Sequence, residues 1–179
     1  LAAVLGLHSK SAPKYGSEKS GAPTNFYLTL SPEPVKITNA QLEEVEIVIS
    51  PDHKVFEHTN PLNGLVPGGT YIMQSGQSPQ EVWEELPDQA RRTLLERRIH
   101  FLIVDAFGVA RRHAPSPDLQ IRMMGVVFIG ALCAQDVRIR QGLNREALLD
   151  KIQQQVEKKF GAKGPEVVES NMRVLEERM

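Results

Sequence analysis

Cysteine is nearly absent from this chain, which has 179 residues and a single thiol at Cys133. One cysteine cannot form an internal disulfide, and it cannot supply the thiolates that hold an iron–sulfur cluster. Because disulfides accumulate in oxidising compartments, this usage favours a reducing, cytoplasmic location. Cys133 itself stands in an apolar segment, where a thiol is usually inert packing.

An excess of charge of one sign is missing too. The sequence has 21 basic and 22 acidic side chains, for a formal net charge of -1. The chain has no global field to attract nucleic acid or an anionic membrane, so we expect neither as a partner. The longest apolar run, residues 123–134, is shorter than the roughly 20 residues that span a bilayer. We interpret this run as a buried helix.

No motif for metal binding or nucleophilic catalysis is evident. The five histidines form neither an H-x-x-x-H nor an H-E-x-x-H pair, and no acidic or thiol partners complete a ligand set. There is also no G-x-S-x-G segment that would place a nucleophile on a strand-to-helix turn. The sequence thus predicts no metal site and no self-sufficient set of catalytic residues.

A loop rich in glycine and serine at residues 15–24, YGSEKSGAPT, is the most distinctive segment that is present. Its glycines permit positive φ and close approach of the backbone, while its hydroxyls and one cation add hydrogen-bond donors. The candidate anion-binding residues are Ser17, Lys19, Ser20 and Gly21. The loop matches neither G-x-x-x-x-G-K-S/T nor G-x-G-x-x-G. Its composition suits a phosphate or carboxylate, although a plain surface connection is the more common use of such a composition.

Three further polar positions have two interpretations each. Asp105 ends an apolar segment, where it either touches a ligand at the carboxyl edge of a sheet or, more simply, caps the next helix. Residues 73–77 stand at the end of another strand, where they line the same crevice or make the turn. Arg122 opens the apolar run, where it either reaches an anion or forms a salt bridge at the helix edge.

Predicted strands and helices alternate through most of the chain. Strands are expected at residues 24–30, 46–49, 70–74 and 99–105, and helices at residues 79–86, 88–98, 118–135, 144–160 and 166–177. Residues 9–23 are expected to form a loop, residues 41–45 one helical turn, and Gly161 the C′ residue of a helix. The alternation predicts an α/β fold with a mainly parallel sheet and a helical C-terminal region.

Five segments of the chain, taken in order, carry a family resemblance. They are YGSEKSGAPT with the strand and SPEPV that follow it, GLVPGGTYIMQS, RRIHFLIVDAFGVAR, IRMMGVVFIGAL and FGAKGPEVVESNMRVL. Together they resemble the γ subunit, or γ-like domain, of the 2-oxoacid:ferredoxin oxidoreductases, which include the pyruvate and 2-oxoglutarate synthases. Asn171 stands at the asparagine of the family's closing helix. Gln74 and Arg122 depart from the pattern, since the family commonly has asparagine at both places.

The resemblance implies a Rossmann-like three-layer domain of an enzyme that oxidatively decarboxylates a 2-oxoacid to an acyl-coenzyme A. It implies that thiamine diphosphate and 4Fe–4S clusters belong to the partners, which are α, β and ferredoxin-like δ subunits or domains, and that ferredoxin accepts the electrons. The γ domain would contribute assembly and coenzyme A access without being catalytic alone. The residues then implied in contact with coenzyme A are Ser17, Lys19, Ser20, Gly21 and Arg122.

The resemblance also implies that residues 1–179 form a single γ-type domain. The chain starts at Leu1 inside a helical pattern, and we expect it to lack the family's N-terminal glycine-rich strand and turn. Two other interpretations stay open: a stand-alone module that binds a nucleotide or coenzyme A, and a purely structural packing domain. Exposed apolar surface would favour a γ domain or a packing domain over the stand-alone module, since both bury a large face on partners.

Overall fold

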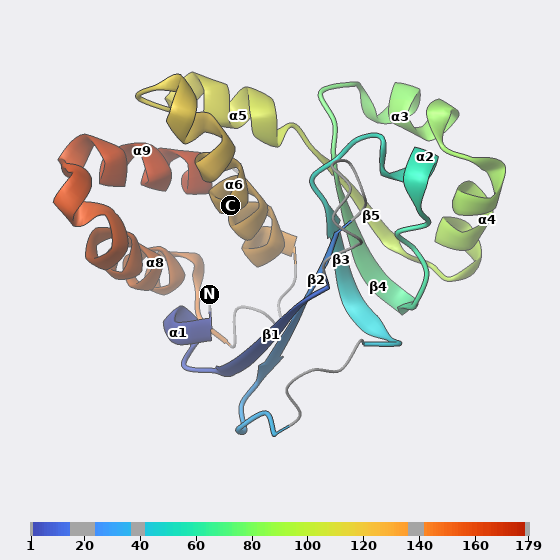
Figure 1. Cartoon of the computed structure of the whole chain (residues 1–179), viewed down its shortest axis with the longest axis horizontal. Coiled ribbons are helices and arrows are strands. Elements are labelled where there is room, and N and C mark those ends of the chain that lie inside the picture. Colours follow the sequence, from blue (N-terminus) through green and yellow to red (C-terminus); the bar gives the residue numbers. More distant parts are fainter. Residues whose placement is uncertain (1, 15–23, 37–41, 136–141, 178–179) are drawn as a thin grey trace. The chain divides into compact units, whose positions relative to one another are not determined.

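The computed structural model describes residues 2–14, 24–36, 42–135 and 142–177. The chain divides into two compact units, one formed mainly by residues 7–103 and the other by residues 104–179 with residues 3–6. The described strands belong mainly to the first unit, and the long helices belong to the second (Figure 1).

A three-stranded parallel sheet is the centre of the first unit. Its strands are β3 (Val45–Ser50), β4 (Leu65–Gln74) and β5 (His100–Val104), in the order β3-β4-β5. The connections between them contain α2 (Val55–His58), α3 (Pro79–Glu85) and α4 (Asp88–Glu96). Parallel strands need such crossovers, because the chain must return along the sheet before it can run in the same direction again. The predicted α/β fold with a mainly parallel sheet is confirmed.

The middle strand, β4, is the most deeply buried of the three. All of residues 69–74 are buried, as expected for a parallel strand covered on both faces. The hydrophobic core around it comprises Leu62, Leu65, Tyr71, Met73, Val82, Leu86, Ala90 and Leu94. Each large apolar side chain removed from water in this way contributes about 1.5–3 kcal/mol. This burial holds α3 and α4 against the sheet.

The start of α3 follows a clear sequence signal. Ser78 caps the helix in a capping box, in which its Oγ accepts the Glu81 N–H at 3.3 Å and a Glu81 carboxylate oxygen accepts the Ser78 N–H at 2.8 Å. Pro79 follows at the first helical position. The start of α4 is different, because Pro87 is its N-cap and Asp88 is already helical.

The first unit also contains a two-stranded antiparallel ribbon, formed by β1 (His8–Lys14) and β2 (Asn25–Ser31). β2 coincides with a predicted strand, whereas the loop predicted for residues 9–14 is wrong. The β1 sequence HSKSAPK has no apolar alternation, and its pairing with β2 along its whole length makes it a strand. The remainder of the predicted loop, residues 15–23, lies outside the described residues.

The described second unit is helical. It contains α5 (Ala106–His113), α6 (Pro117–Gln135), α8 (Arg145–Phe160) and α9 (Pro165–Glu176), together with most of α1 (Ala2–Leu5). α6 packs against α5 and α9, and α9 packs against α8. The Oδ1 atom of Asn144 caps α8 by accepting the Ala147 N–H at 2.8 Å. The predicted helical C-terminal region is therefore present.

Among the described helices, α6 alone has the length and apolar composition needed to cross a membrane, and 44% of its window Pro117–Ala134 is buried inside the protein. Met123, Val127 and Cys133 are at most 2% exposed, so these side chains lie in the core of the helical unit. Their burial supports the interpretation of the apolar run as a core helix, since the core helix of a globular protein has the same length and composition.

Two local predictions are wrong. Gly161 has a φ of −56° and does not end α8 in the left-handed region; a short 3-10 turn, Gly161–Lys163, follows instead. Gly164, at a φ of 105°, makes the turn into α9, and a positive φ of this kind favours glycine. Residues 42–44 are not helical and lead directly into β3, while residue 41 lies outside the described residues.

Candidate functional site

Four of the five candidate anion-binding residues lie outside the described residues. These are Ser17, Lys19, Ser20 and Gly21. The structure does show where their segment is attached, because Lys14 pairs with Asn25 at the ends of β1 and β2. The segment therefore starts and ends at the same end of the ribbon, so it joins two strands of a hairpin. The prediction of an anion site in this segment stays a prediction.

Arg122, the fifth candidate, is exposed on α6. The Asp118 carboxylate lies one helical turn before it, and the pKa of Asp118 is lowered. The largest cause is a hydrogen bond with the Ser116 side chain, and the charges of Arg122 and Lys163 act in the same direction. Arg122 thus shares an exposed surface with one carboxylate and a second cation, which is the environment expected of a charged helix edge. An anion at Arg122 would have to compete with Asp118.

Asp105 caps α5. Its Oδ1 atom accepts the Gly108 N–H at 2.8 Å, which satisfies one of the unpaired donors of the first helical turn. A Cβ atom on Gly108 would lie only 1.8 Å from Asp105 Oδ2, so the cap also depends on the glycine. The capping interpretation of Asp105 is confirmed.

The segment that follows β4 makes the turn into α3. The Ser75 hydroxyl accepts the Gln77 N–H at 3.1 Å, and the Gln77 side-chain amide donates to Glu85 Oε1 at 2.7 Å. Gln74 and Ser75 are 4% and 3% exposed. These hydrogen bonds hold the turn in place, which is the simpler of the two interpretations of residues 73–77.

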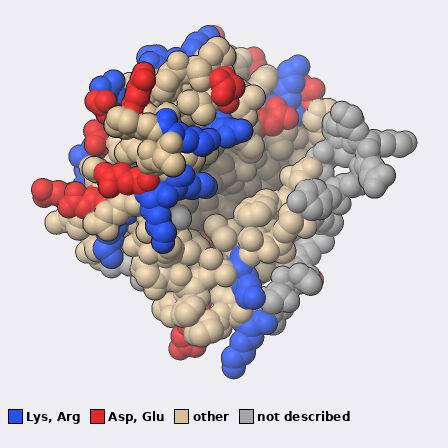
Figure 2. Space-filling view, turned by 60° about the vertical axis from the view of Figure 1, so that its left-hand side comes forward, with Lys and Arg blue, Asp and Glu red and all other residues tan. Residues whose placement is uncertain are grey.

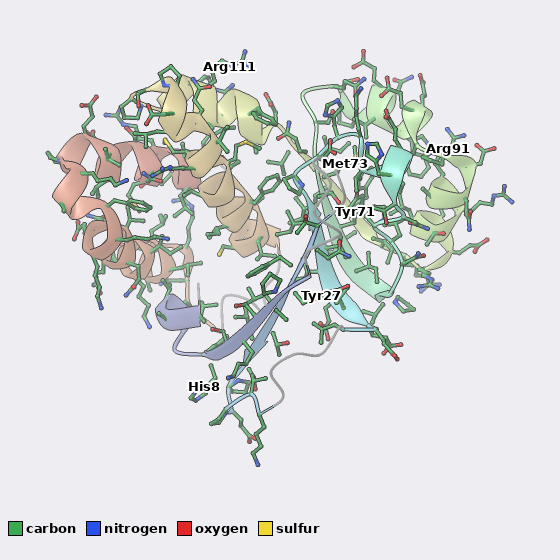
Figure 3. The ribbon with its side chains drawn as sticks, in the orientation of Figure 1. His8, Tyr27, Tyr71, Met73, Arg91 and Arg111 are labelled. Carbon is green, nitrogen blue, oxygen red and sulfur yellow. The ribbon has the colours of Figure 1, made fainter. Side chains whose placement is uncertain are left out.

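Tyr71 is a buried polar residue that no motif of the sequence distinguishes. Its side chain lies on β4 (Figure 3) and is fully buried. The ring is stacked on that of Phe101, with centroids 5.4 Å apart, and the Phe56 ring contacts it edge-on at 6.1 Å. Among the described residues, no group forms a hydrogen bond of acceptable geometry with its hydroxyl. In the sequence, Tyr71 is visible only as a tyrosine in the middle of an apolar strand. Whether its hydroxyl has a hydrogen-bond partner depends on how the side chains pack, which the sequence does not show.

The environment of Tyr71 keeps its hydroxyl protonated. Burial raises the pKa of Tyr71 far above its usual value, the nearby Ser50 hydroxyl lowers it in part, and the Asp52 carboxylate raises it further. A phenol with so high a pKa cannot act as a base near neutral pH. Tyr71 is therefore a packing residue in the described structure.

A carboxylate joins two helices of the second unit. Glu177, just after α9, forms an ion pair with Arg112, and its Oε2 atom lies 2.6 Å from His113 Nε2 on α5. Partial burial raises the pKa of Glu177, but the hydrogen bonds and charges of His113 and Arg112 outweigh this effect and lower it overall. All three side chains are partly exposed, and the arrangement is that of a structural clamp.

The described surface has no dominant field. Basic and acidic side chains are interspersed on the face that Figure 2 shows. A shallow depression of about 420 Å³ beside α4 is lined by Gln89, Arg92, Thr93 and Glu96, and both signs of charge occur in it. Within the described ranges, no three His, Cys, Asp or Glu side chains are grouped as a metal site would require.

Comparison with known proteins identifies the family. The chain matches the pyruvate ferredoxin/flavodoxin oxidoreductase family over residues 1–179, and it belongs to that family. The resemblance to the 2-oxoacid:ferredoxin oxidoreductases is therefore confirmed.

The curated relatives are much longer than this chain. A putative pyruvate-flavodoxin oxidoreductase of Synechocystis is 27% identical over 162 residues, which cover 90% of this chain and 13% of that protein. The pyruvate-flavodoxin oxidoreductase of Klebsiella pneumoniae is 26% identical over 170 residues, covering 95% of this chain and 14% of that protein. The chain thus corresponds to a small part of each relative.

A solved structure supports the fold. The pyruvate oxidoreductase subunit PORC of Thermotoga maritima matches with a TM-score of 0.64 and 20% sequence identity, over 99% of this chain and 83% of that subunit. The match covers nearly the whole chain, so the arrangement of strands and helices described above is one that occurs in a solved protein.

Proposed function

We propose that this chain is the γ-like domain of an enzyme that oxidatively decarboxylates a 2-oxoacid to an acyl-coenzyme A. The family match over residues 1–179 is the observation that carries the proposal. The likeness to a separate subunit and to a small part of longer proteins fits a domain that works within a larger assembly. Its partners are then the α, β and δ subunits or domains of the enzyme, with ferredoxin or flavodoxin as electron acceptor.

Thiamine diphosphate and the 4Fe–4S clusters are assigned to those other parts. Iron–sulfur clusters are held by several thiolates, whereas this sequence has one cysteine, which is buried in α6. The residues of this chain therefore do not fit a cluster. We place the enzyme in the cytoplasm, because a chain with a single thiol needs no oxidising compartment.

Coenzyme A access is the specific role proposed for this domain. Coenzyme A carries several phosphate charges, and the segment SEKSG contains a cation, two hydroxyls and a glycine whose backbone N–H is a further donor. This segment connects Lys14 and Asn25, which pair at one end of the ribbon. The candidate contacts are Ser17, Lys19, Ser20 and Gly21, with Arg122 as a less specific one. The chemistry of these donors fits a phosphate, and they would bind and orient coenzyme A.

Steady-state kinetics of the complete enzyme test this role. Lys19→Ala should raise the KM for coenzyme A by about tenfold, because one charge-assisted hydrogen bond contributes about 1.5–3 kcal/mol. The KM for the 2-oxoacid should stay unchanged, since the 2-oxoacid is bound elsewhere. Lys36→Ala removes an exposed cation that follows β2 and serves as the matched control. An unchanged KM for coenzyme A in Lys19→Ala would refute the assignment.

A further inference from the structure

The ribbon of β1 and β2 has no third strand among the described residues. An isolated two-stranded ribbon is at best marginally stable in water, and it becomes stable when further structure covers it. Pro13 within β1 suits an edge strand, because proline cannot donate a ladder hydrogen bond. The ribbon therefore needs other parts of a protein to cover it, and the exposure of its two faces indicates which face they cover.

The two faces differ in their composition. Side chains alternate along a strand, so the pairing places one set on each face. We call one of them the inner face, and it contains His8, Lys10, Ala12, Asn25, Tyr27, Thr29 and Ser31. The outer face contains Ser9, Ser11, Pro13, Phe26, Leu28 and Leu30. The outer face has no charged residue.

The more apolar face is the more exposed one. Phe26 is 64% exposed and Leu28 is 47% exposed on the outer face, whereas Tyr27 and Thr29 on the inner face are half-buried. A ribbon folded for contact with water would show the opposite arrangement, with polar residues outward. An uncharged strip with an exposed aromatic residue has the composition of the core of a protein interface.

We propose that this outer face docks against an apolar surface in another part of the same oxidoreductase. This inference rests on the proposed function, and it specifies which surface of the domain makes the assembly contact. The chain corresponds to 13% and 14% of the length of the two curated relatives described above, so most of such an enzyme lies outside it. The rest of such an enzyme is large and stays together with this domain, so it supplies a permanent partner for the outer face. Without such a partner, the apolar side chains of the outer face would remain in contact with water.

Footprinting of the complete enzyme tests the proposal without any variant. Hydroxyl-radical oxidation should modify Phe26 and Leu28 at least about tenfold more slowly than their exposure in this chain implies, as expected for side chains excluded from water in an interface core. Leu95 and Ile121, which are 67% and 74% exposed, serve as internal references after correction for intrinsic reactivity. Oxidation of Phe26 at the rate of these references would overturn the proposal.

A photo-crosslinking residue at position 26 identifies the occupant in the purified enzyme. A cross-link to a peptide outside the 179-residue chain supports the proposal. A cross-link to a second copy of this chain, or no cross-link at all, contradicts it. These outcomes distinguish a partner domain from self-association.

Charge substitutions give the energetic test. Phe26→Asp combined with Leu28→Asp should weaken assembly by about tenfold or more, because buried aromatic anchors dominate interface affinity. Lys10→Asp, on the other face of the same ribbon, is the matched control and should assemble normally. An equal loss of assembly in both variants would contradict the proposal, because the outer face would then have no special part in the contact.

The test separates this inference from the proposed function. If the complete enzyme oxidises a 2-oxoacid with coenzyme A but Phe26 is accessible, only the docking surface is wrong. If Phe26 is protected in an assembly without that activity, the docking surface stands and the proposed function fails.

Discussion

At the scale of single residues, Tyr71 departs from the rule that a buried polar group has a hydrogen-bond partner. A buried hydroxyl without a partner costs about 1–3 kcal/mol, since it gives up its hydrogen bonds to water. Tyr71→Phe removes the hydroxyl and keeps the rings stacked on Phe101. We expect the variant to be more stable by about 1 kcal/mol, measured as a higher midpoint of urea unfolding.

The control for this substitution is Tyr27→Phe, because Tyr27 is only half-buried and its hydroxyl can reach water. It should leave the midpoint nearly unchanged. The raised pKa of Tyr71 adds a second signature, since the wild-type protein should lose stability as the pH rises above about 10, where the unfolded tyrosine ionises first. Tyr71→Phe should lose less stability in that range. A destabilised variant would mean that the hydroxyl has a partner.

At the scale of secondary-structure elements, two helical glycines should respond to alanine in opposite directions. A Cβ atom on Gly108 would lie 1.8 Å from the carboxylate that caps α5, whereas a Cβ atom on Gly125 in α6 would meet nothing within 4 Å. Gly125→Ala should therefore stabilise the protein by about 0.5–1 kcal/mol through helix propensity. Gly108→Ala should destabilise it by about 0.5–2 kcal/mol, because the Asp105 cap is lost.

A double-mutant cycle with Asp105→Ala isolates the cause of the second effect. Once the cap is absent, Gly108→Ala has no carboxylate to displace and should no longer be destabilising. Thermal unfolding followed by circular dichroism is sufficient for all four variants. If Gly108→Ala were equally harmful with and without Asp105, the clash would not be with the cap.

Elements with a strong local signal were predictable from the sequence. The capping box at Ser78, the Asn144 cap and the apolar segment of β5 each encode their structure within a few residues. β1 was not predictable, because its sequence is polar and its partner supplies the strand geometry. The role of Gly161 was not predictable for a similar reason: the glycine with a positive φ after α8 is Gly164. Which glycine ends a helix depends on the path of the chain that follows.

At the scale of the whole molecule, the candidate site was predictable only in part. The sequence pattern gave the family, which the match over residues 1–179 confirms, and it gave the anion-binding chemistry of the loop as a prediction. It did not show that the loop closes a hairpin, because that depends on the pairing of Lys14 with Asn25. The exposed face of the ribbon also could not be foreseen, because alternation in β2 shows that Phe26 and Leu28 share a face but not which face is covered.

The whole helical unit should become less stable in acid through one carboxylate. Glu177 joins residues 64 and 65 positions away in the chain, so its ion pairs hold α5 close to the end of α9. Its pKa is lower in the folded protein than in the unfolded chain. The stabilisation is therefore present above the ordinary glutamate pKa of about 4.3 and is lost as the pH falls through the lower, folded value.

Glu177→Gln should accordingly be less stable than the wild-type protein at neutral pH, by up to about 1 kcal/mol for such a partly exposed cluster. The difference should begin to shrink as the pH falls through the ordinary glutamate pKa of about 4.3, and it should vanish only below the lower, folded pKa, where the carboxylate is protonated in the folded protein as well. Urea unfolding across this pH range measures it. Glu169→Gln is the matched control, because Glu169 pairs with Arg173 within α9 itself and holds no second helix. A difference between Glu177→Gln and the wild type that persisted unchanged in acid would show that the glutamate acts through packing and not through its charge.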